Sequence, residues 1–158
     1  MFKVGDKVVY PMHGAGVIEA IEEKEVLGQN RKYYVLRLPL GDMKIMVPIA
    51  SVHEIGLRQV IDGCSVERVL SILGDRSNTM TASWNRRYRA NLEKMRSGNI
   101  FEVAEVVKNL VLREREKGLS TGERKMLESA RQILVSELVL AGNRLEEDVV
   151  NLIQGILV

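Results

Sequence analysis

Residues 33–48 have the sequence YYVLRLPLGDMKIMVP, which contains the clearest strand pattern of the chain. Apolar residues recur at every second position over 33–38, and this spacing is typical of a strand with one buried face. Leu40-Gly41-Asp42 predicts a hairpin turn, and residues 43–47 predict a second strand that Pro48 ends. The stretch therefore predicts a pair of antiparallel strands.

Two further strands are predicted on the N-terminal side of this pair. They cover residues 8–10 and 17–26, and they are separated by Pro11 and a glycine-rich turn at 13–16. Four short strands joined by glycine and proline turns favour a small β-barrel over residues 1–56. A core of this size is marginal, so we expect such a barrel to pack against, or bind, another surface.

The spacing of apolar residues becomes helical after Ser65. Ser65 itself is a candidate cap, and Gly74 and Gly98 are expected to end the first two helices. Ser or Asn followed three residues later by Glu has the spacing of a capping box, which marks the start of a helix. Three such pairs predict the remaining helices, and they begin at Asn99, Ser120 and Asn143.

These patterns predict an α+β fold with two domains. A small β-barrel occupies residues 1–56, a short linker occupies 57–64, and a compact bundle of about five α-helices occupies 65–158. The sequence has no internal repeat and no low-complexity segment, so a long flexible tether between the domains is not expected.

The composition is that of a globular protein without a membrane-spanning segment. The chain has 158 residues, of which 46% are hydrophobic and 28% are charged. No apolar run approaches the roughly 20 residues that a transmembrane helix needs. Charged residues interrupt the N-terminus, so no secretory signal is expected. Cys64 is the only cysteine, which predicts no internal disulfide, fits a cytoplasmic protein, and favours a small buried thiol.

The sequence offers no arrangement of residues that indicates catalysis or metal binding. His13 and His53 are forty residues apart in the sequence, and neither has a second ligand at the spacing of a metal site. Gly14-Ala15-Gly16 lacks the third glycine and the Lys-Ser/Thr of phosphate-binding loops, so a turn explains it. We therefore expect no enzyme activity, no catalytic residue, no metal, no cofactor and no small-molecule substrate.

The basic residues gather in one part of the chain. Residues 76–96 contain six basic residues and one acidic residue, Glu93. Inside this stretch, residues 84–89 (WNRRYR) predict a helix with aromatic residues on its inner side and arginines on its outer side. Dense arginines suit contacts with phosphate groups, although many exposed helices carry a solvated charge run of this kind. The residues alone leave both interpretations open.

Trp84 is the only tryptophan of the chain, and it too allows two interpretations. Its spacing to Tyr88 and Leu92 is that of a buried helix stripe, which favours a place in the core. Its position in the first turn, beside several arginines, favours instead an exposed plate that stacks on bases or wedges between them.

Two motifs resemble segments of a known family. Residues 2–11 (FKVGDKVVYP), followed by His13-Gly14, and residues 84–94 (WNRRYRANLEK) are similar to the CarD/CdnL family of bacterial RNA polymerase-binding transcription regulators. Residues 118–123 and 130–134 also resemble family sequence. The first motif alone is shared with the polymerase-binding segment of the transcription-repair coupling factor, whereas the two motifs together are specific. The resemblance covers nearly the whole chain.

The resemblance implies a Tudor-like barrel that docks on the β subunit of RNA polymerase holoenzyme by strand pairing, and a helical domain that contacts promoter DNA. Trp84 would enter the minor groove at the upstream edge of the bubble and stabilise the open promoter complex, with low sequence specificity. The implied DNA-binding residues are Trp84, Arg86, Arg87, Tyr88, Arg89 and Arg124. The implied polymerase-binding residues are Lys24, Glu25, Val26, Lys44 and Met46, of which Met46 stands where relatives often carry Arg.

Two other functions are consistent with the residues. A protein-interaction adaptor would use the helical domain without direct DNA contact, and a general nucleic-acid binder would bind without polymerase. The implied location is the cytoplasm, at the nucleoid through RNA polymerase. We expect a monomer with no membrane contact, and self-pairing through the barrel edge is the alternative.

Overall fold

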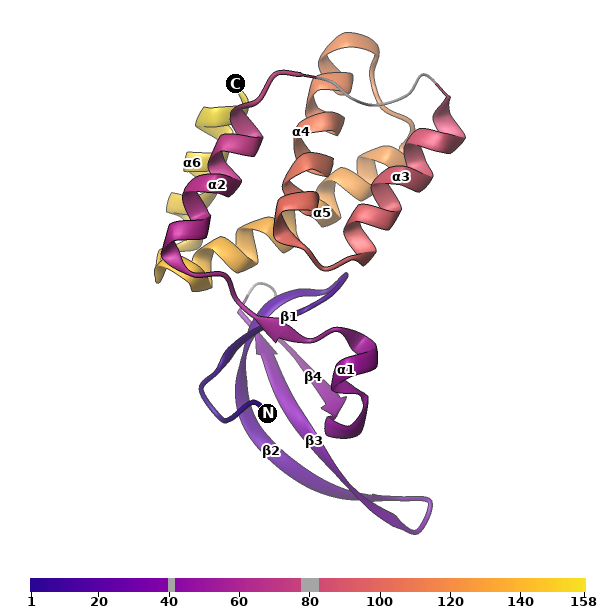
Figure 1. Cartoon of the computed structure of the whole chain (residues 1–158), viewed down its shortest axis with the longest axis vertical. Coiled ribbons are helices and arrows are strands. Elements are labelled where there is room, and N and C mark those ends of the chain that lie inside the picture. Colours follow the sequence, from indigo (N-terminus) through magenta and orange to yellow (C-terminus); the bar gives the residue numbers. More distant parts are fainter. Residues whose placement is uncertain (40–41, 78–82) are drawn as a thin grey trace.

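The computed structural model describes residues 1–39, 42–77 and 83–158 of the chain. It has an α+β fold, in which a five-stranded antiparallel sheet lies at one end and the long helices lie at the other (Figure 1). The C-terminus lies at the far end of the helical part, away from the sheet. The predicted fold class, a Tudor-like β domain followed by a helical domain, is confirmed. The predicted turn at Leu40-Gly41-Asp42 falls largely outside the described residues.

The sheet contains the four predicted strands and one more. Its strand order is β4-β3-β2-β1-β5. The strands are β1 Lys7–Tyr10, β2 Gly14–Val26, β3 Gln29–Leu38, β4 Met43–Pro48 and β5 Arg58–Gln59. A 3-10 helix, η1 Ile49–Ser51, and a short helix, α1 Val52–Ile55, connect β4 to β5. β5 lies inside residues 57–64, which we expected to be a linker, and it pairs with β1. Two residues are too short a strand to give a periodic pattern.

One face of the sheet buries a small apolar core. Tyr34 lies in this core and donates its phenolic hydroxyl to the carbonyl oxygen of Phe2 at 3.2 Å. The same hydroxyl accepts from the backbone N–H of Phe2 at 3.1 Å. These bonds satisfy the polar end of a buried ring and hold the N-terminal segment against the sheet. The other buried members are Val8, Ile18, Leu36, Leu38, Val47 and Leu57.

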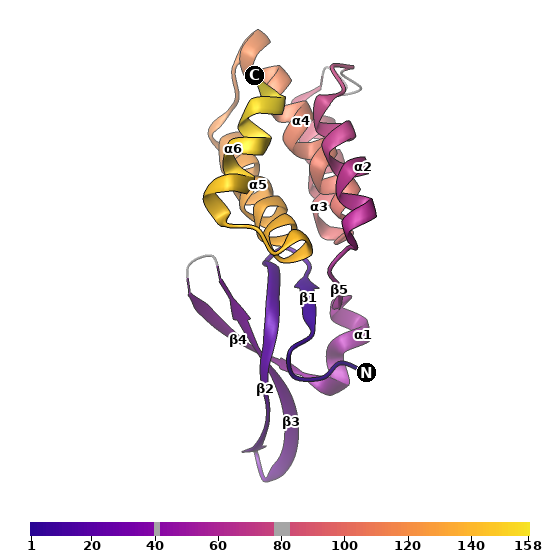
Figure 2. The same ribbon diagram turned by 90° about the vertical axis from the view of Figure 1, so that its left-hand side faces the viewer.

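Five long helices form the second part, as the sequence predicted, and α1 brings the described α-helices to six. They are α2 Gly63–Gly74, α3 Trp84–Arg96, α4 Ile100–Lys117, α5 Thr121–Gly142 and α6 Glu146–Leu157. α4 packs on α2, α3 and α5, and α5 also packs on α6 and on β2 (Figure 2). Their apolar stripes meet in one core, which includes Val69, Leu73, Val107, Leu110, Ala130, Leu134, Val149 and Ile153.

Two predicted helix caps are confirmed. The Asn99 side chain accepts from the backbone N–H of Phe101 at the start of α4. The Ser120 side chain accepts from the backbone N–H of Glu123 at the start of α5. In both cases a short polar side chain satisfies a backbone donor that the first helical turn leaves without a partner.

Two other predicted caps are wrong. α2 begins earlier than expected, because the Asp62 carboxylate, rather than Ser65, is its cap. Asn143 does not begin α6 but ends α5 in the left-handed conformation, with φ of 49°. Asn is among the few residues that adopt this conformation at low cost, so it suits a helix end as well as a helix start. The residue that caps α6 is Leu145. Its helical spacing to Val149 predicted a buried residue, which is wrong, because Leu145 is 71% exposed.

Cys64 is exposed in the first turn of α2, so the expectation of a buried thiol is wrong. The buried side of α2 is formed by Val69 and Leu73, and the helical repeat of 3.6 residues turns residue 64 away from them. In the three described ranges, no helix combines the length and the apolar character needed to cross a membrane.

Gly16 lies where β2 and β3 approach each other closely, and its substitution tests this contact. A Cβ at this position would lie 2.5 Å from the carbonyl oxygen of Arg37. That carbonyl belongs to β3, where Arg37 pairs with Val17, so it cannot move without disturbing the β2–β3 register. We expect Gly16→Ala to lower the free energy of unfolding by about 1–3 kcal/mol, as measured by urea denaturation.

The matched control is Gly63→Ala. Apart from its chain neighbours and the backbone of its own helix, no heavy atom of the described residues lies within 4 Å of a Cβ at Gly63, so the change should stay within about 0.5 kcal/mol. An equal loss of stability in both variants would show that the close approach at Gly16 is not the cause.

Candidate nucleic-acid interface

α3 carries the aromatic and basic motif, and it begins away from the sheet and ends beside it (Figure 1). Trp84 is its first residue, and 45% of its surface is exposed. The indole stacks on the Tyr88 ring, with centroids 5.2 Å apart and planes 18° apart. Trp84 is therefore not a core residue. It is an aromatic plate at the edge of the helical part, supported by a second ring.

The first turn of α5 holds this plate in place. The Trp84 indole Nε1 donates to the Ser120 Oγ at 3.0 Å. A Cβ at Gly122 would lie 3.5 Å from the Tyr88 ring, so both rings lie against this turn. The sequence identified Ser120 only as a helix cap, because nothing in one sequence links it to a residue 36 positions earlier. The orientation of the indole thus depends on a long-range contact.

A buried ion pair fastens α3 to α5 next to the two rings. Arg87 is 3% exposed and Glu123 is 1% exposed. The Arg87 Nε donates to the Glu123 Oε2 at 2.8 Å, and its Nη2 donates to Oε1 at 3.1 Å. The Ser120 Oγ also lies 3.3 Å from Oε1. Hydrogen bonds from Arg87 lower the pKa of Glu123 below its usual value, although burial alone would raise it.

We expected Arg87 to face outward with the other arginines of α3, and this is wrong. Helical geometry places Arg87, Asn91 and Met95 on one stripe, and all three are buried. We did not assign Arg87 to this stripe, because a cation is a poor core residue unless a partner is present. That partner, Glu123, is 36 residues away in the sequence. Arg87 is therefore a structural residue beneath the candidate interface and not an exposed contact.

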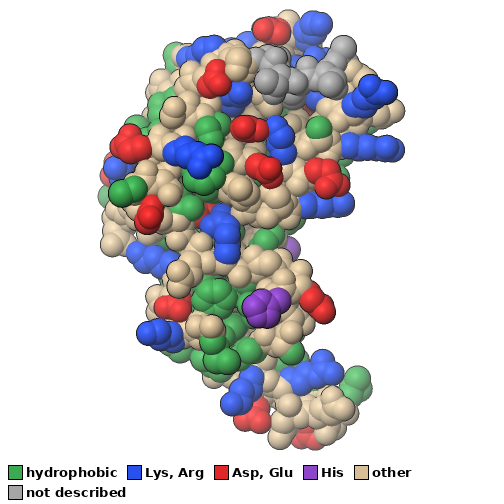
Figure 3. Space-filling model, in the orientation of Figure 1, with side chains coloured by type: hydrophobic (Ala, Val, Ile, Leu, Met, Phe, Trp, Pro, Cys, Tyr) green, Lys and Arg blue, Asp and Glu red, His purple; other side chains and the backbone are tan. Residues whose placement is uncertain are grey.

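Other basic residues of 76–96 also have structural roles. The Lys94 Nζ lies 2.7 Å from the Glu105 Oε2 in an ion pair. Arg76 donates to backbone carbonyl oxygens at the C-terminal end of α6. The positive charge is thus less concentrated than the sequence suggested. Within the described ranges, the cations of α3 that are exposed and form no ion pair are Arg86, Arg89 and Arg96. Figure 3 shows Lys and Arg side chains along the side of the helical part where α3 lies.

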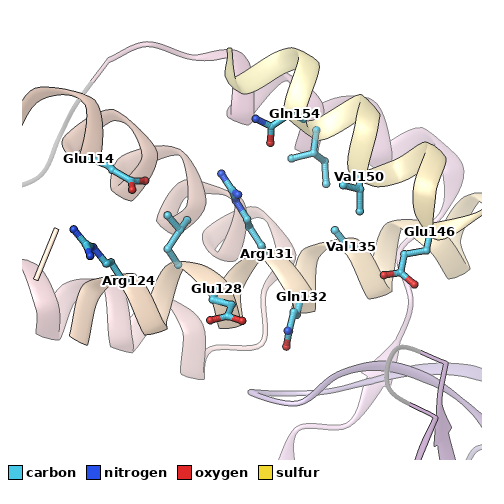
Figure 4. A pocket seen from close by; sticks show the side chains of 11 residues that line it. Glu114, Arg124, Glu128, Arg131, Gln132, Val135, Glu146, Val150 and Gln154 are labelled. Atoms are coloured by element: carbon cyan, nitrogen blue, oxygen red, sulfur yellow. The ribbon is translucent and has the colours of Figure 1, made fainter. Parts of the chain in front are cut away.

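Arg124 is exposed in the first turn of α5, directly after Glu123. It lines a pocket of about 420 Å³ between α4, α5 and α6. In Figure 4, Arg124 and Glu114 lie at the same end of this pocket. The lining also contains Glu128, Arg131 and Glu146. Mixed charges of this kind do not suit a polyanion, so the pocket itself is a poor candidate for a DNA-binding surface.

The predicted polymerase-binding residues 24–26 lie at the end of β2 and are exposed. β1 pairs with β2 over residues 14–17. The contact extends to Ile18, whose carbonyl oxygen accepts from the Gly5 N–H and whose N–H donates to the Asp6 carbonyl oxygen. β3 pairs with the other side of β2 as far as Val26. In the described part of the chain, no strand pairs with residues 20–26 on the β1 side. We name this stretch the open β2 edge.

Lys44 and Met46 lie on β4, at the opposite edge of the sheet. The β2–β3–β4 register places them on the same face as Lys24, because side chains alternate along each strand. Lys44 forms an exposed ion pair with Glu19 at 3.2 Å. The structure thus brings Lys24, Lys44 and Met46 to one face, but β3 separates β4 from the open β2 edge.

The Arg87–Glu123 pair predicts acid sensitivity. The pKa of Glu123 is lower in the folded chain than in the unfolded chain. Ionised Glu123 therefore contributes stability above the ordinary glutamate pKa of about 4.3, and this contribution is lost as the pH falls through the folded value. We expect Glu123→Gln to lower the free energy of unfolding by about 3–5 kcal/mol at neutral pH, with a smaller loss near pH 3.

Urea unfolding followed by Trp84 fluorescence at both pH values measures this difference. A loss of stability that is the same at neutral and at acid pH would contradict the assignment of the effect to the ionised carboxylate.

The Ser120 contact predicts a change at Trp84 itself. Ser120→Ala removes the acceptor of the indole N–H, so we expect faster decay of Trp84 fluorescence anisotropy and emission at longer wavelength. The control is Asn99→Ala, which removes the cap of α4 at a similar cost of about 1 kcal/mol but leaves the indole contacts in place. Equal anisotropy decays in these two variants would argue against the Ser120 contact.

Each of the two parts of the chain matches a known family model. Residues 2–61 match the family model of the CarD-like/TRCF RID domain, and residues 68–154 match that of the CarD C-terminal domain. YdeB of Bacillus subtilis (strain 168), whose name describes a transcription factor, is 41% identical over 138 residues, which are 87% of this chain and 90% of YdeB. The solution structure of the 72-residue N-terminal domain of Myxococcus xanthus CarD is 39% identical, covers 37% of this chain and 79% of that domain, and has a TM-score of 0.33. The two family matches account for most of the sequence, and the chain belongs to the CarD family of transcription regulators.

Proposed function

We propose that this regulator docks on the β subunit of RNA polymerase through its sheet and contacts promoter DNA through α3. The observation that carries the proposal is the half-exposed Trp84, which is held at its N–H edge by α5 and lies on a helix with exposed arginines. A flat apolar ring presented in this way suits wedging or stacking against bases. The RID match of residues 2–61 supports a polymerase contact by the sheet.

In this mechanism Trp84 occupies space at the upstream edge of the bubble that exists only where the duplex is distorted. A contact that is made only with distorted DNA shifts the population toward the open promoter complex. A base–aromatic stack is worth about 1–3 kcal/mol, which corresponds to a shift of roughly 5- to 150-fold. The indole N–H already bonds to Ser120, so it does not read a base edge, and low sequence specificity follows.

Arg86 and Arg89 serve the phosphate backbone in this proposal, with Arg124 at the border. Few phosphates are neutralised, so the affinity for DNA alone is expected to be weak. Docking on polymerase compensates for this weakness, because it raises the local concentration of the helical domain at the promoter.

The open β2 edge is the proposed docking strand. Its unpaired backbone N–H and C=O groups suit the addition of a strand from the polymerase. Residues 22–25 carry three acidic side chains and Lys24, so pairing of two copies would bring like charges together, which opposes self-association. Met46 lacks the positive charge of the Arg that relatives often carry at this position. A contact between β4 and the polymerase would therefore depend on apolar packing of Met46 and on Lys44.

Trp84→Ala tests the wedge. We expect it to shorten the lifetime of the open promoter complex with cognate polymerase about tenfold, because the stacking energy is lost. Trp84→Phe retains an aromatic plate and should give an intermediate lifetime. Competitor-challenge decay of preformed complexes measures the effect, and urea unfolding checks that the variants are folded. An unchanged lifetime in Trp84→Ala would reject the wedge, and unquenched Trp84 fluorescence on DNA addition would favour the adaptor function.

The salt dependence of binding tests the phosphate contacts. Arg86→Ala and Arg89→Ala should each reduce the slope of log affinity against log salt by about one unit, as measured with fork-junction DNA. Arg96→Ala is the control, because this exposed arginine lies in the last turn of the same helix, beside the sheet. If all three variants have the same slope as the wild-type protein, α3 is a solvated charged face.

A further inference from the structure

Arg58 joins three parts of the chain. It lies in β5, which pairs with β1. Its Nη1 and Nη2 donate to the Glu137 Oε2 and Oε1 at 2.8 and 2.7 Å, and Glu137 belongs to α5. Its Nε donates at 2.8 Å to the carbonyl oxygen of Gly98, between α3 and α4. One guanidinium thus connects the sheet to α5 and to the end of α3. We name Arg58, Gly98 and Glu137 the interdomain clasp.

Glu137 has 0% exposure. Besides the two bonds from Arg58, its Oε2 accepts from the backbone N–H of Ile61 at 2.9 Å. A fully buried carboxylate is tolerated only when such donors surround it. Because a planar guanidinium meets a carboxylate through two parallel bonds, this contact favours one relative orientation of the sheet and α5.

Close packing beside the clasp restricts movement of the sheet against the helices. A Cβ at Gly98 would lie 2.9 Å from the Pro11 side chain, so the turn after β1 lies directly against the end of α3. The Ser136 Oγ of α5 accepts from the backbone N–H of Ala15 in β2 at 2.9 Å. Figures 1 and 2 both place α5 and the end of α3 beside the ends of β1 and β2.

The clasp lies between the two surfaces of the proposed function. The β2–β3 hairpin extends away from the helices, and α3 begins at the opposite end of the helical part. We propose that Arg58 and Glu137 are positioning residues, which hold the open β2 edge and Trp84 at one fixed spacing and orientation. Polymerase docked on the sheet then brings the indole to the edge of the bubble. The functional half of this inference rests on the proposed function.

The physical reason is the effective concentration of the second contact. Two contacts on one body bind together well only when their spacing matches the spacing of the two targets. If the sheet could move relative to the helices, Trp84 would sample many positions, and only a few of these positions would reach the bubble. Buried ion pairs often add little net stability over an apolar pair, and specification of one geometry is a use for which they are suited. The clasp is therefore expected to affect coupling more than either contact alone.

Energy transfer from Trp84 measures the geometry directly, because it is the only tryptophan. The acceptor is a thiol-linked dye in a full-length chain that carries Cys64→Ser and Leu27→Cys, since Leu27 is fully exposed at the hairpin tip. We expect one narrow donor–acceptor distance distribution in this protein and a broader distribution when Glu137→Gln or Arg58→Lys is added. Arg58→Lys retains a charge beside Glu137, but a single ammonium cannot reproduce the forked bonds to Glu137 and Gly98.

The matched control is Glu105→Gln, which breaks the 2.7 Å ion pair with Lys94 inside the helical domain and should leave the distribution narrow. Circular dichroism verifies folding, and if Glu137→Gln unfolds, Arg58→Lys still decides the question. A distribution that stays as narrow in Arg58→Lys as in the control would overturn the clasp.

Open-complex lifetime measures the consequence in the unlabelled chain. We expect Arg58→Lys to shorten the lifetime of the open promoter complex by about tenfold. This loss is part of the roughly 100- to 10,000-fold gain in avidity that a well-fitted link between two contacts gives. Affinity for polymerase alone should remain unchanged. A broad distribution with wild-type lifetime would overturn the positioning role. If the proposed function is wrong, Trp84→Ala leaves the open-complex lifetime unchanged. The donor–acceptor distance distribution tests the clasp independently of that result.

Discussion

The buried ion pair between Arg87 and Glu123 is the contact on which the candidate interface depends. It joins the first turns of α3 and α5, and the hydroxyl of Ser120 links the carboxylate to the indole of Trp84. Charged groups removed from water are tolerated only with their hydrogen bonds in place. The pair therefore fixes how the two helices meet, and with them the direction in which the exposed ring faces. An aromatic plate held in this way loses little freedom when it binds.

Arginine has one structural task in this protein and one proposed task in DNA binding. Arg58 and Arg87 direct their forked donors at buried carboxylates and connect elements that are distant in the sequence. Arg86 and Arg89 face solvent on the outer side of α3. The planar guanidinium suits both tasks, because it pairs equally well with a carboxylate or a phosphate. Part of the positive charge is neutralised by ion pairs within the fold, so fewer cations of α3 remain for the proposed phosphate contact, which fits a mechanism with a second anchor.

The proposed docking strand is open because neighbouring strands differ in length. β1 has 4 residues and β2 has 13, so β1 covers only the first part of β2. At the end of β1 that lies away from the open β2 edge, the turn that contains Pro11 packs against the end of α3. This turn connects β1 to β2, and it also joins the sheet to the helices. The exposed strand and the exposed ring are parts of one continuous framework through α5.

The sequence by itself determined the longer elements and the family. Period-two and helical spacings identified four strands and five long helices, and the Asn99 and Ser120 caps were correctly placed, because these signals lie within a few residues of one another. The two motifs were enough to indicate a CarD-family regulator. Asn143 was assigned to the wrong helix end because its side chain suits both ends.

Only the tertiary structure decided which cations are buried and which are exposed. Arg87 and Arg86 are neighbours in the sequence, yet one is enclosed and the other faces solvent. The difference depends on Glu123, 36 residues away, just as the role of Arg58 depends on Glu137. A buried charge is stable only where a distant partner meets it, and local sequence patterns carry no information about that meeting.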